Sequence, residues 1–333
     1  MPHPLACVVV NPAKRSATPQ VLERVERALT DAGYRTHLLE TSLAEPGPTQ
    51  ARLAVASGAR LVVAAGGDGT VRAVAAALAG TGIEMGVLPL GTANLAARNL
   101  GLPVRDLDVL IGAAAHGEAR PADLAWVSSG APDPEALAAV RTPPGGWARP
   151  TLGAEHACIL VTGIGFDAGL VASTRPRLKA RIKWGAYAVA AMENLWSPRL
   201  GMTLDLTGTD GARSTELLTA RTLLLANGGR LPGGITLMRS ATMDDGVMDL
   251  AAIDTVAGLA GWTSLARQVL PPFAATYSRP ERSLGRVRLR RGVEARVRLD
   301  TPAMVEVDGD LLPPTRDVRV RLEAGALLVR RPA

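Results

Sequence analysis

The residues with the clearest potential for chemistry form one short stretch, Gly66-Gly67-Asp68-Gly69-Thr70. It follows the apolar run 61–65 and precedes the Ala- and Val-rich segment 71–78, so the pattern predicts a strand, a tight loop and a helix. Glycines let a ligand approach the main chain, and the free N–H groups at a helix start bind phosphate. We expect Thr70 to cap this helix. Asp68 would repel phosphate unless it holds Mg²⁺ or orients a reacting hydroxyl. On these five residues alone, a purely structural turn is the alternative.

A second stretch has the same design. The apolar run 85–90 leads into Gly91-Thr92-Ala93-Asn94, which opens a predicted helix over 95–100. Two successive strand ends therefore bring Gly, Thr and a polar side chain to one edge of a parallel sheet, where α/β proteins bind ligands. Asn11 and Thr41 follow two further predicted strands at the same edge. Their local alternative is a loop-forming Asn-Pro and a helix-capping Thr.

The elements that must position these residues alternate between strand and helix. Strands are predicted at 5–10, 36–40 and 61–65, with helices at 19–32, 49–57 and about 106–115. Such alternation indicates a parallel sheet covered by helices. From about residue 121 the runs become short and strand-like, and 128–153, with five prolines, is predicted to be a long hairpin loop. We expect an α/β protein with an N-terminal parallel-sheet nucleotide-binding domain (1–120), a β-rich, sandwich-like domain (121–313) and a final strand region (314–333) returning to the first domain.

Several motifs together resemble a known family. They are Asn11-Pro12, Gly66 to Thr70, Pro89 to Asn94 with Ala97-Arg98, Gly163 to Ala168, Lys183 to Tyr187, Asp244 to Asp249, and Val307 to Asp310. In this order they resemble the diacylglycerol kinase and sphingosine kinase superfamily, in particular its soluble bacterial lipid kinases. The resemblance covers nearly the whole chain. It implies transfer of the ATP γ-phosphate to a lipid hydroxyl with Mg²⁺, with diacylglycerol to phosphatidic acid as the first guess.

The resemblance also assigns roles to residues. ATP would lie on Asn11, Thr41, the loop Gly66 to Thr70, Thr92 and Asn94, with Mg²⁺ near Asp68. The turn Asp308-Gly309-Asp310 would supply the proton acceptor that phosphoryl transfer to a hydroxyl needs. The family usually has Glu where this chain has Asp310, so either the backbone compensates for the shorter side chain or Asp308 takes more of the role. By local sequence alone, this turn is structural.

Two further features qualify the resemblance. The turn Asp244-Asp245-Gly246 looks like a plain turn, but in similar bacterial lipid kinases the position of Asp245 ligates a structural Mg²⁺ with main-chain carbonyls, here those of Thr242 and Val247. Many bacterial diacylglycerol kinases carry Asp where this chain has Leu95. That departure weakens the assignment to diacylglycerol and leaves kinase activity open, because sphingosine-kinase-like members also lack an acid there.

The charge balance favours anionic partners. The 333 residues carry a formal net charge of +6, which suits a nucleotide or an acidic membrane surface. The segment 175–196 joins a basic half to Trp and Tyr residues, and is either a membrane-surface helix or one packed on the second domain. Arg286, Arg288 and Arg290 share one strand face that is either solvated or docks on phospholipid headgroups. Aromatic platforms for nucleic acid are lacking, so no nucleic-acid partner is expected.

Other classes of protein are disfavoured by the sequence. No apolar run reaches the roughly 18 residues of a spanning helix, and the first residues lack a signal peptide. We expect a cytoplasmic protein that contacts membranes peripherally and acts on a lipid substrate, with a homodimer as a possible assembly. The two cysteines and four scattered histidines indicate neither a disulfide nor a zinc site.

Two rival functions stay open at this stage. An NAD kinase also uses a Gly-Gly-Asp-Gly-Thr loop, although Gly-Thr-Ala-Asn and the C-terminal Asp-Gly-Asp argue against it. A non-catalytic lipid- or nucleotide-binding regulator is compatible with Leu95 and Asp310.

Overall fold

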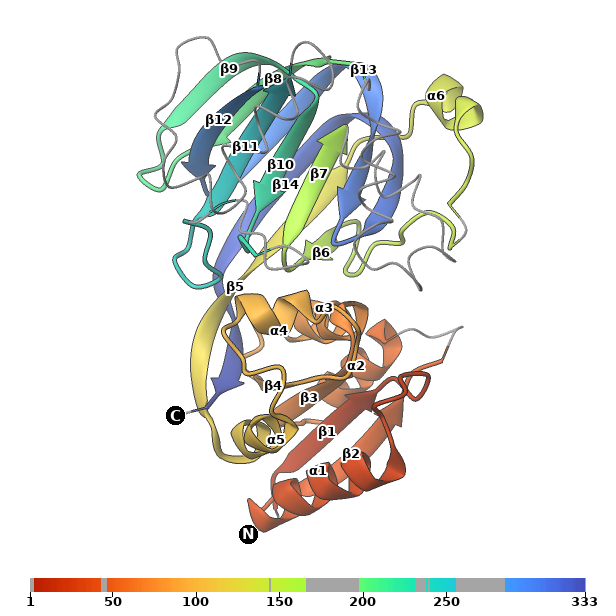
Figure 1. Ribbon diagram of the computed structural model, residues 1–333, viewed down its shortest axis with the longest axis vertical. Helices are drawn as coiled ribbons and strands as arrows, with labels where there is room; N and C mark the ends of the chain where they lie inside the picture. Colours follow the sequence, from red (N-terminus) through yellow and green to blue (C-terminus); the bar gives the residue numbers. More distant parts are fainter. Residues whose placement is uncertain are drawn as a thin grey trace.

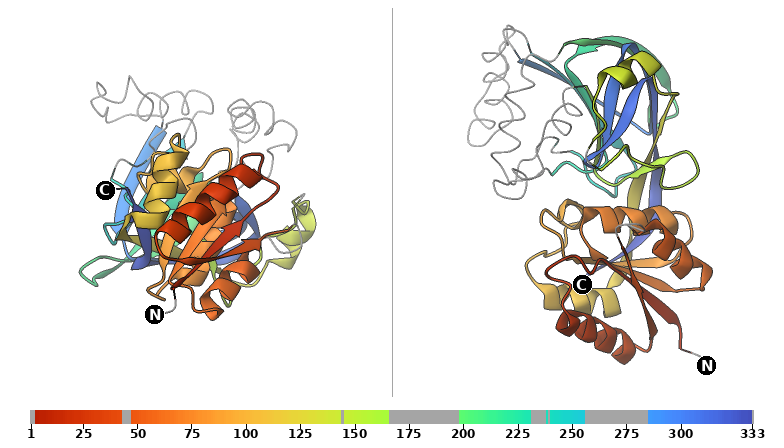
Figure 2. Two further views of the ribbon diagram at one scale, coloured as in Figure 1. Left: turned by 90° about the horizontal axis from the view of Figure 1, so that it is seen from below. Right: turned by 90° about the vertical axis from the view of Figure 1, so that its right-hand side faces the viewer.

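The chain folds into two lobes joined by two long strands. The computed structural model describes residues 3–42, 47–143, 145–165, 198–230, 238, 240–255 and 285–332. An α/β lobe carries both ends of the chain, and a β-rich lobe stands on it (Figure 1). The strands β5 (Glu118–Ser129) and β14 (Asp310–Arg331) run between the lobes, as the side view in Figure 2 also shows.

The α/β lobe has a parallel sheet in the order β4-β3-β1-β2. Its strands are β1 (Leu5–Val10), β2 (Arg35–Glu40), β3 (Leu61–Gly66) and β4 (Glu84–Pro89). Its helices are α1 (Pro19–Asp31), α2 (Pro48–Ala56), α3 (Asp68–Leu78), α4 (Leu95–Asn99) and α5 (Leu107–His116). The chain leaves β1 toward β2 and leaves β3 toward β4, in opposite directions. The carboxyl ends of β1 and β3 therefore form a topological switch point, where open α/β sheets bind ligands.

The sequence explains this arrangement locally. Five of the six residues of β1 and all six of β3 are buried and nearly all apolar, as expected for central parallel strands covered on both faces. Helix α1 starts where Thr18 accepts a hydrogen bond from the N–H of Val21 and Pro19 takes the first helical position. The α/β prediction for this half is confirmed.

The second lobe is an antiparallel, sandwich-like β structure, again as predicted. Its strands are β6 (His156–Cys158), β7 (Val161–Gly165), β8 (Leu200–Thr207), β9 (Arg213–Ala220), β10 (Thr222–Ala226), β11 (Met248–Thr255), β12 (Gly285–Gly292) and β13 (Glu294–Val307), completed by β14. The path β12-β11-β10-β7-β13-β14 is extended by β8 on β13 and β9 on β8. One buried apolar cluster gathers side chains from β8, β10, β11, β13 and β14. It forms the core of this lobe.

The last strand completes the sheet of the first lobe. Leu328 and Val329 of β14 pair in parallel with Glu84 and Met85 of β4. Arg330, almost fully buried, lies 2.6 Å from the Glu84 carboxylate and donates to the carbonyl groups of helix α5. A buried guanidinium with this many partners ties the end of the chain to the α/β lobe.

Two sequence predictions about local structure need correction. The segment 128–153 is not a hairpin loop throughout: it contains the helix α6 (Pro134–Ala139), because Asp133 accepts a hydrogen bond from the N–H of Ala136 and Pro134 begins the helix. Thr70 does not cap α3. The helix starts at Asp68 with Gly67 at the cap position, and Thr70 is buried inside the first turn.

One membrane prediction lies outside the described residues. The segment 175–196 falls there entirely. Within the described part of the chain, no helix combines the length and the apolar character that crossing a bilayer requires.

Candidate active site

The two glycine-rich loops of the α/β lobe touch each other through their backbones. A Cβ atom on Gly91 would lie 2.6 Å from Cα of Gly67, closer than such atoms approach. The N–H of Leu90 donates to the carbonyl of Gly66 at 2.8 Å. Glycine is thus required at position 91 for close approach, whereas a Cβ on Gly67 would meet its nearest neighbours at 3.5 Å and beyond. By contrast, a Cβ on Gly69 would meet nothing within 4 Å, so open space lies beside the first turn of α3.

Asn94 shapes the second loop. Its backbone is left-handed, with a φ of 50°, a conformation that Asn tolerates better than most residues. Its side-chain amide donates to the carbonyl groups of Pro89 and Gly91 at 2.9 and 3.1 Å. Thr92 is exposed at the tip of this loop. Asn94 therefore holds the loop that presents Thr92.

Asp68 is a half-buried carboxylate at the start of α3. Its Oδ1 accepts a hydrogen bond from the N–H of Ala96 at 2.9 Å, which links the first turns of α3 and α4. Burial raises the pKa of Asp68, the N–H of Ala96 opposes that change, and the negative charge of Asp308 adds to it. Among the described residues no arginine or lysine forms an ion pair with Asp68. A buried carboxylate in this position fits a divalent cation such as Mg²⁺.

The end of β1 supplies the other side of the switch point. The N–H of Asn11 donates to Ala65 at 3.1 Å, and its side chain accepts from the N–H of Ala13 at 3.0 Å. Thr41 is 5% exposed, and its N–H donates to Val10. Lys14, which the sequence reading did not single out, places Nζ 3.7 Å from where a Cβ on Gly67 would stand. Its ammonium group therefore lies beside the glycine loop, where a phosphate would need a counter-charge.

The predicted acidic turn is a tight hairpin at the end of β13. Val307 pairs with Asp310, and Asp308 and Gly309 between them have φ values of 49° and 91°. Two consecutive positive φ angles define the two-residue hairpin that Asp-Gly favours. The N–H of Gly309 also donates to the side chain of Glu306. The turn is therefore held from within its own strand.

Asp308 is fully engaged by backbone. Its carboxylate accepts hydrogen bonds from the N–H groups of Ile159, Leu160 and Val161 at 2.7, 2.9 and 3.1 Å. Ile159 and Leu160 form the connection from β6 to β7, and Val161 begins β7. A carboxylate that satisfies three N–H groups is well suited to holding that connection and poorly placed to accept a substrate proton.

Asp310 has the opposite environment. Its side chain is 53% exposed and forms an ion pair with Arg72 of helix α3. Arg72, 16% exposed, also donates to the carbonyl of Val307 at 2.8 Å. Burial disfavours the charge on this guanidinium, but the charges of Asp308 and Asp310 outweigh it and raise the pKa of Arg72. Arg72 lies one turn after Asp68 on α3, so the two residues share one side of the helix. Asp310, the partner of Arg72, therefore faces the same side of the helix as Asp68.

His156 of β6 is buried next to this ion pair. Burial lowers the pKa of His156, and the positive charge of Arg72 lowers it further, while Asp310 acts in the opposite direction. Burial and the Arg72 charge therefore both favour the neutral imidazole. Local sequence patterns do not indicate His156 or Arg72, because their proximity arises from elements far apart in the chain.

The second acidic turn stands apart from these residues. The carboxylate of Asp245 lies 2.5 Å from Arg291 and accepts from the N–H of Val247 at 3.2 Å. Thr242 is exposed in the same turn. Buried Asp123 fastens the turn through the N–H of Gly246 at 2.8 Å. Within the ranges that the structure covers, no group of three His, Cys, Asp or Glu side chains converges as a metal cluster. A metal at Asp245, Thr242 and Val247 stays a prediction.

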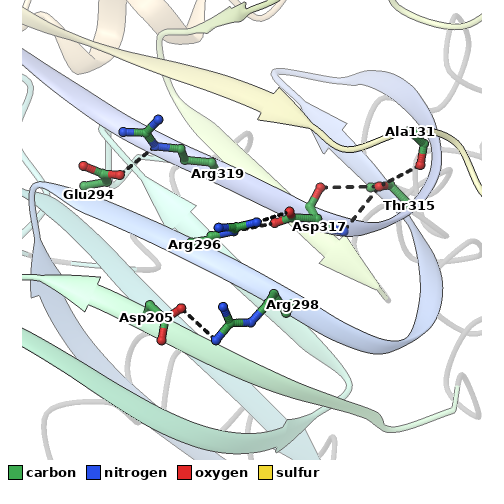
Figure 3. Close-up of polar contacts among 8 residues, drawn as sticks. All are labelled: Ala131, Asp205, Glu294, Arg296, Arg298, Thr315, Asp317 and Arg319. Carbon is green, nitrogen blue, oxygen red and sulfur yellow. Dashed lines mark hydrogen bonds and ion pairs between the residues drawn. The ribbon is translucent and has the colours of Figure 1, made fainter.

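Acids offset part of the predicted basic face. Arg288 and Arg290 of β12 both pair with Glu216 of β9, at 3.5 and 2.9 Å. On the neighbouring strands Arg296 pairs with Asp317, Arg298 with Asp205 and Arg319 with Glu294 (Figure 3). Pairs of this kind leave fewer unpaired positive charges on these strands than the sequence suggested. Docking on phospholipid headgroups stays a prediction.

The fold and the site define a two-domain α/β protein. Two glycine-rich loops, of the kind that binds phosphate, lie on the side of the α/β lobe that faces the acidic hairpin 308–310. Residues 5–127 match the family model for the diacylglycerol kinase catalytic domain. A protein of Chromohalobacter salexigens described as a probable YegS-like lipid kinase is 31% identical over 246 residues, which cover 72% of this chain and 68% of that relative. The corresponding protein of Cronobacter sakazakii is 26% identical over 324 residues, covering 96% and 93%.

A solved structure agrees on the fold. The crystal structure of a candidate diacylglycerol kinase from Bacillus anthracis superimposes with a TM-score of 0.71 over 99% of this chain and 96% of that one, at 18% identity. Together with the sequence relatives, this shows that the chain belongs to the diacylglycerol-kinase-like family that includes the YegS-like lipid kinases. The predicted resemblance is confirmed.

Proposed function

We propose that this protein is an ATP-dependent lipid kinase with Asp310 as its proton acceptor. The observation that carries the proposal is the position of Asp310. It is an exposed carboxylate, held by Arg72 on the same helix that begins with Asp68. A phosphoryl-transfer enzyme needs a phosphate cradle, a cation site and a base near one another, and these residues fit the three parts.

The ATP phosphates would lie against the first turn of α3. The open space beside Gly69, the N–H groups of Asp68 and Gly69 at the start of the helix and the Lys14 ammonium suit a polyphosphate. Asn11, Thr41 and Thr92 line the same edge of the sheet and would contact the nucleotide. Mg²⁺ would be held at Asp68, where it would neutralise phosphate charge.

The reaction then needs one proton acceptor. The lipid hydroxyl gives its proton to the Asp310 carboxylate while its oxygen attacks the γ-phosphorus. The bond between that phosphorus and the β,γ-bridging oxygen breaks, and ADP leaves with the bonding electrons. Asp308 is assigned a structural role, because its oxygens already accept three N–H groups. On this ground we propose Asp310 as the base, where the sequence left both acids open.

The substrate class rests on the relatives, which are described as lipid kinases. Diacylglycerol, giving phosphatidic acid, is our first candidate, and the β-rich lobe would hold the acyl chains. Leu95, the first residue of α4, brings no carboxylate to the cation site beside Asp68. We further propose peripheral contact with an anionic membrane, from which the lipid would enter.

Transfer of radiolabel tests the proposal. The purified protein is incubated with [γ-³²P]ATP, Mg²⁺ and an extracted lipid pool, and labelled lipids are identified by mass. Asp68→Ala and Asp310→Ala are run beside the wild type. We expect a labelled lipid that disappears in both variants. Label in NAD⁺, supplied as a competing acceptor, or ATP binding with no labelled product, would overturn the proposal in favour of an NAD kinase or a regulator.

A further inference from the structure

One guanidinium holds both sides of the acidic hairpin. Nη1 of Arg72 donates to the carbonyl of Val307, the last residue of β13, and Nη2 donates to the carboxylate of Asp310, the first residue of β14. These two residues face each other across the two-residue turn. A planar guanidinium can make both contacts at once because its N–H groups form a fixed fork.

The other contacts of the hairpin do not orient Asp310. The N–H groups of residues 159–161 hold Asp308, and Glu306 holds the N–H of Gly309. They fix the path of the backbone through the turn. The Asp310 side chain, more than half exposed, has Arg72 as its ion-pair partner within the described residues. An exposed carboxylate without such a partner would sample several rotamers.

Arg72 also connects the two lobes. It belongs to helix α3 of the α/β lobe, whereas Val307 and Asp310 belong to strands of the β-rich lobe. Asp68, which begins the same helix, lies one turn away. The Arg72 side chain thus fixes the position of Asp310, in the β-rich lobe, relative to the glycine loop 66–70 of the α/β lobe.

We propose that Arg72 is a positioning residue that aims the Asp310 carboxylate at the substrate hydroxyl, an inference that rests on the lipid kinase function proposed above. Arg72 acts through Asp310 and contacts neither ATP nor lipid. Its removal therefore lowers kcat and leaves the KM for ATP unchanged. A displaced base about 1 Å from its productive place costs about 100-fold in rate.

The test is a kinetic cycle on the full chain, with the lipid acceptor identified by the labelling experiment above. Arg72→Ala is expected to lower kcat about 100-fold in the wild-type background and to change it little when Asp310 is already Ala, because both variants remove one shared function. Added guanidinium should restore part of the kcat of Arg72→Ala. The kcat of Arg72→Lys should lie between those of the wild type and Arg72→Ala, since an ammonium group cannot make both contacts in the same geometry.

A matched control separates this role from general stability. Arg296→Ala removes another arginine–aspartate pair from β13 and β14, eleven residues along the strand from Val307, roughly 35 Å of extended chain. It should leave kcat unchanged. Full activity in Arg72→Ala, or effects of Arg72→Ala and Asp310→Ala that simply multiply, would overturn the positioning role. If even the wild type labels no lipid, the proposed function fails, and the positioning role fails with it.

Discussion

Asp308 and Asp310 stand two residues apart, yet we expect their substitution to fail in different ways. Asp308→Ala removes the acceptor of three backbone N–H groups and leaves them without a partner. At about 1.5 kcal/mol for each charge-assisted bond, the low end because Asp308 is only partly buried, the loss is about 4.5 kcal/mol. The left-handed backbone at this position, with a φ of 49°, costs Ala roughly 1 kcal/mol more.

Hydrogen exchange measures this effect where it arises. If the connection opens more easily by about 4.5 kcal/mol, the amides of Ile159, Leu160 and Val161 should exchange about 2,000-fold faster in Asp308→Ala. Asp308→Asn keeps one acceptor oxygen and tolerates the left-handed backbone, so its amides should exchange only about tenfold to 100-fold faster.

Asp310→Ala is the matched comparison. Its side chain is exposed and receives no backbone N–H bond in the described part of the chain, so those three amides should keep their wild-type protection while phosphoryl transfer is lost. The reasoning is refuted if Asp308→Ala retains full protection at residues 159–161, or if Asp310→Ala exposes them.

Three further outcomes follow from packing and charge. Gly91→Ala should weaken ATP binding and lower the unfolding midpoint, because its Cβ would stand 2.6 Å from Cα of Gly67. Gly69→Ala should weaken ATP binding alone, because its Cβ enters open space. Calorimetry of ATP binding and thermal melting distinguish the two variants. His156 has a pKa lowered by burial from its ordinary 6.5, so the unfolded chain binds the proton first and stability falls as pH drops below 6.5 toward the folded-state value. Urea midpoints across that window should decline less in His156→Gln than in the wild type. Arg330→Ala should cost about 3 kcal/mol in urea unfolding, because it leaves the Glu84 carboxylate without the partner that lies 2.6 Å away; a loss below about 1 kcal/mol would contradict the buried anchor.

The local features of the fold could be predicted from the sequence. Strand β1 occupies the predicted residues 5–10, and the alternation of strands and helices through residue 116 follows from hydrophobic periodicity and caps. The Asp308-Gly309 turn was also predictable, since Asp-Gly supplies the positive φ angles that a two-residue hairpin needs. The start of α3 was not, because Gly67 caps it through its backbone alone.

The long-range contacts of the site could not be predicted in this way. Asp308 finds its N–H partners about 150 residues earlier in the chain, and Arg72 meets Asp310 across 238 positions. Neither partner leaves a mark in local spacing. The same holds for Arg290 of β12 and Arg298 of β13, whose acidic partners sit on other strands, β9 and β8. Sequence patterns therefore indicate which residues carry charge. The fold determines which of those charges form ion pairs.

The central claim, phosphoryl transfer to a lipid with Asp310 as the base, is tested most directly by one rate comparison. The wild type and Asp310→Asn are assayed with saturating [γ-³²P]ATP, Mg²⁺ and dispersed lipid, with nucleotide affinity measured on the same preparations. Asn can still accept a hydrogen bond from Arg72 but cannot take the proton. We predict equal nucleotide affinity and a rate of lipid labelling at least about 100-fold lower in Asp310→Asn. Equal labelling rates in the two proteins would contradict the claim.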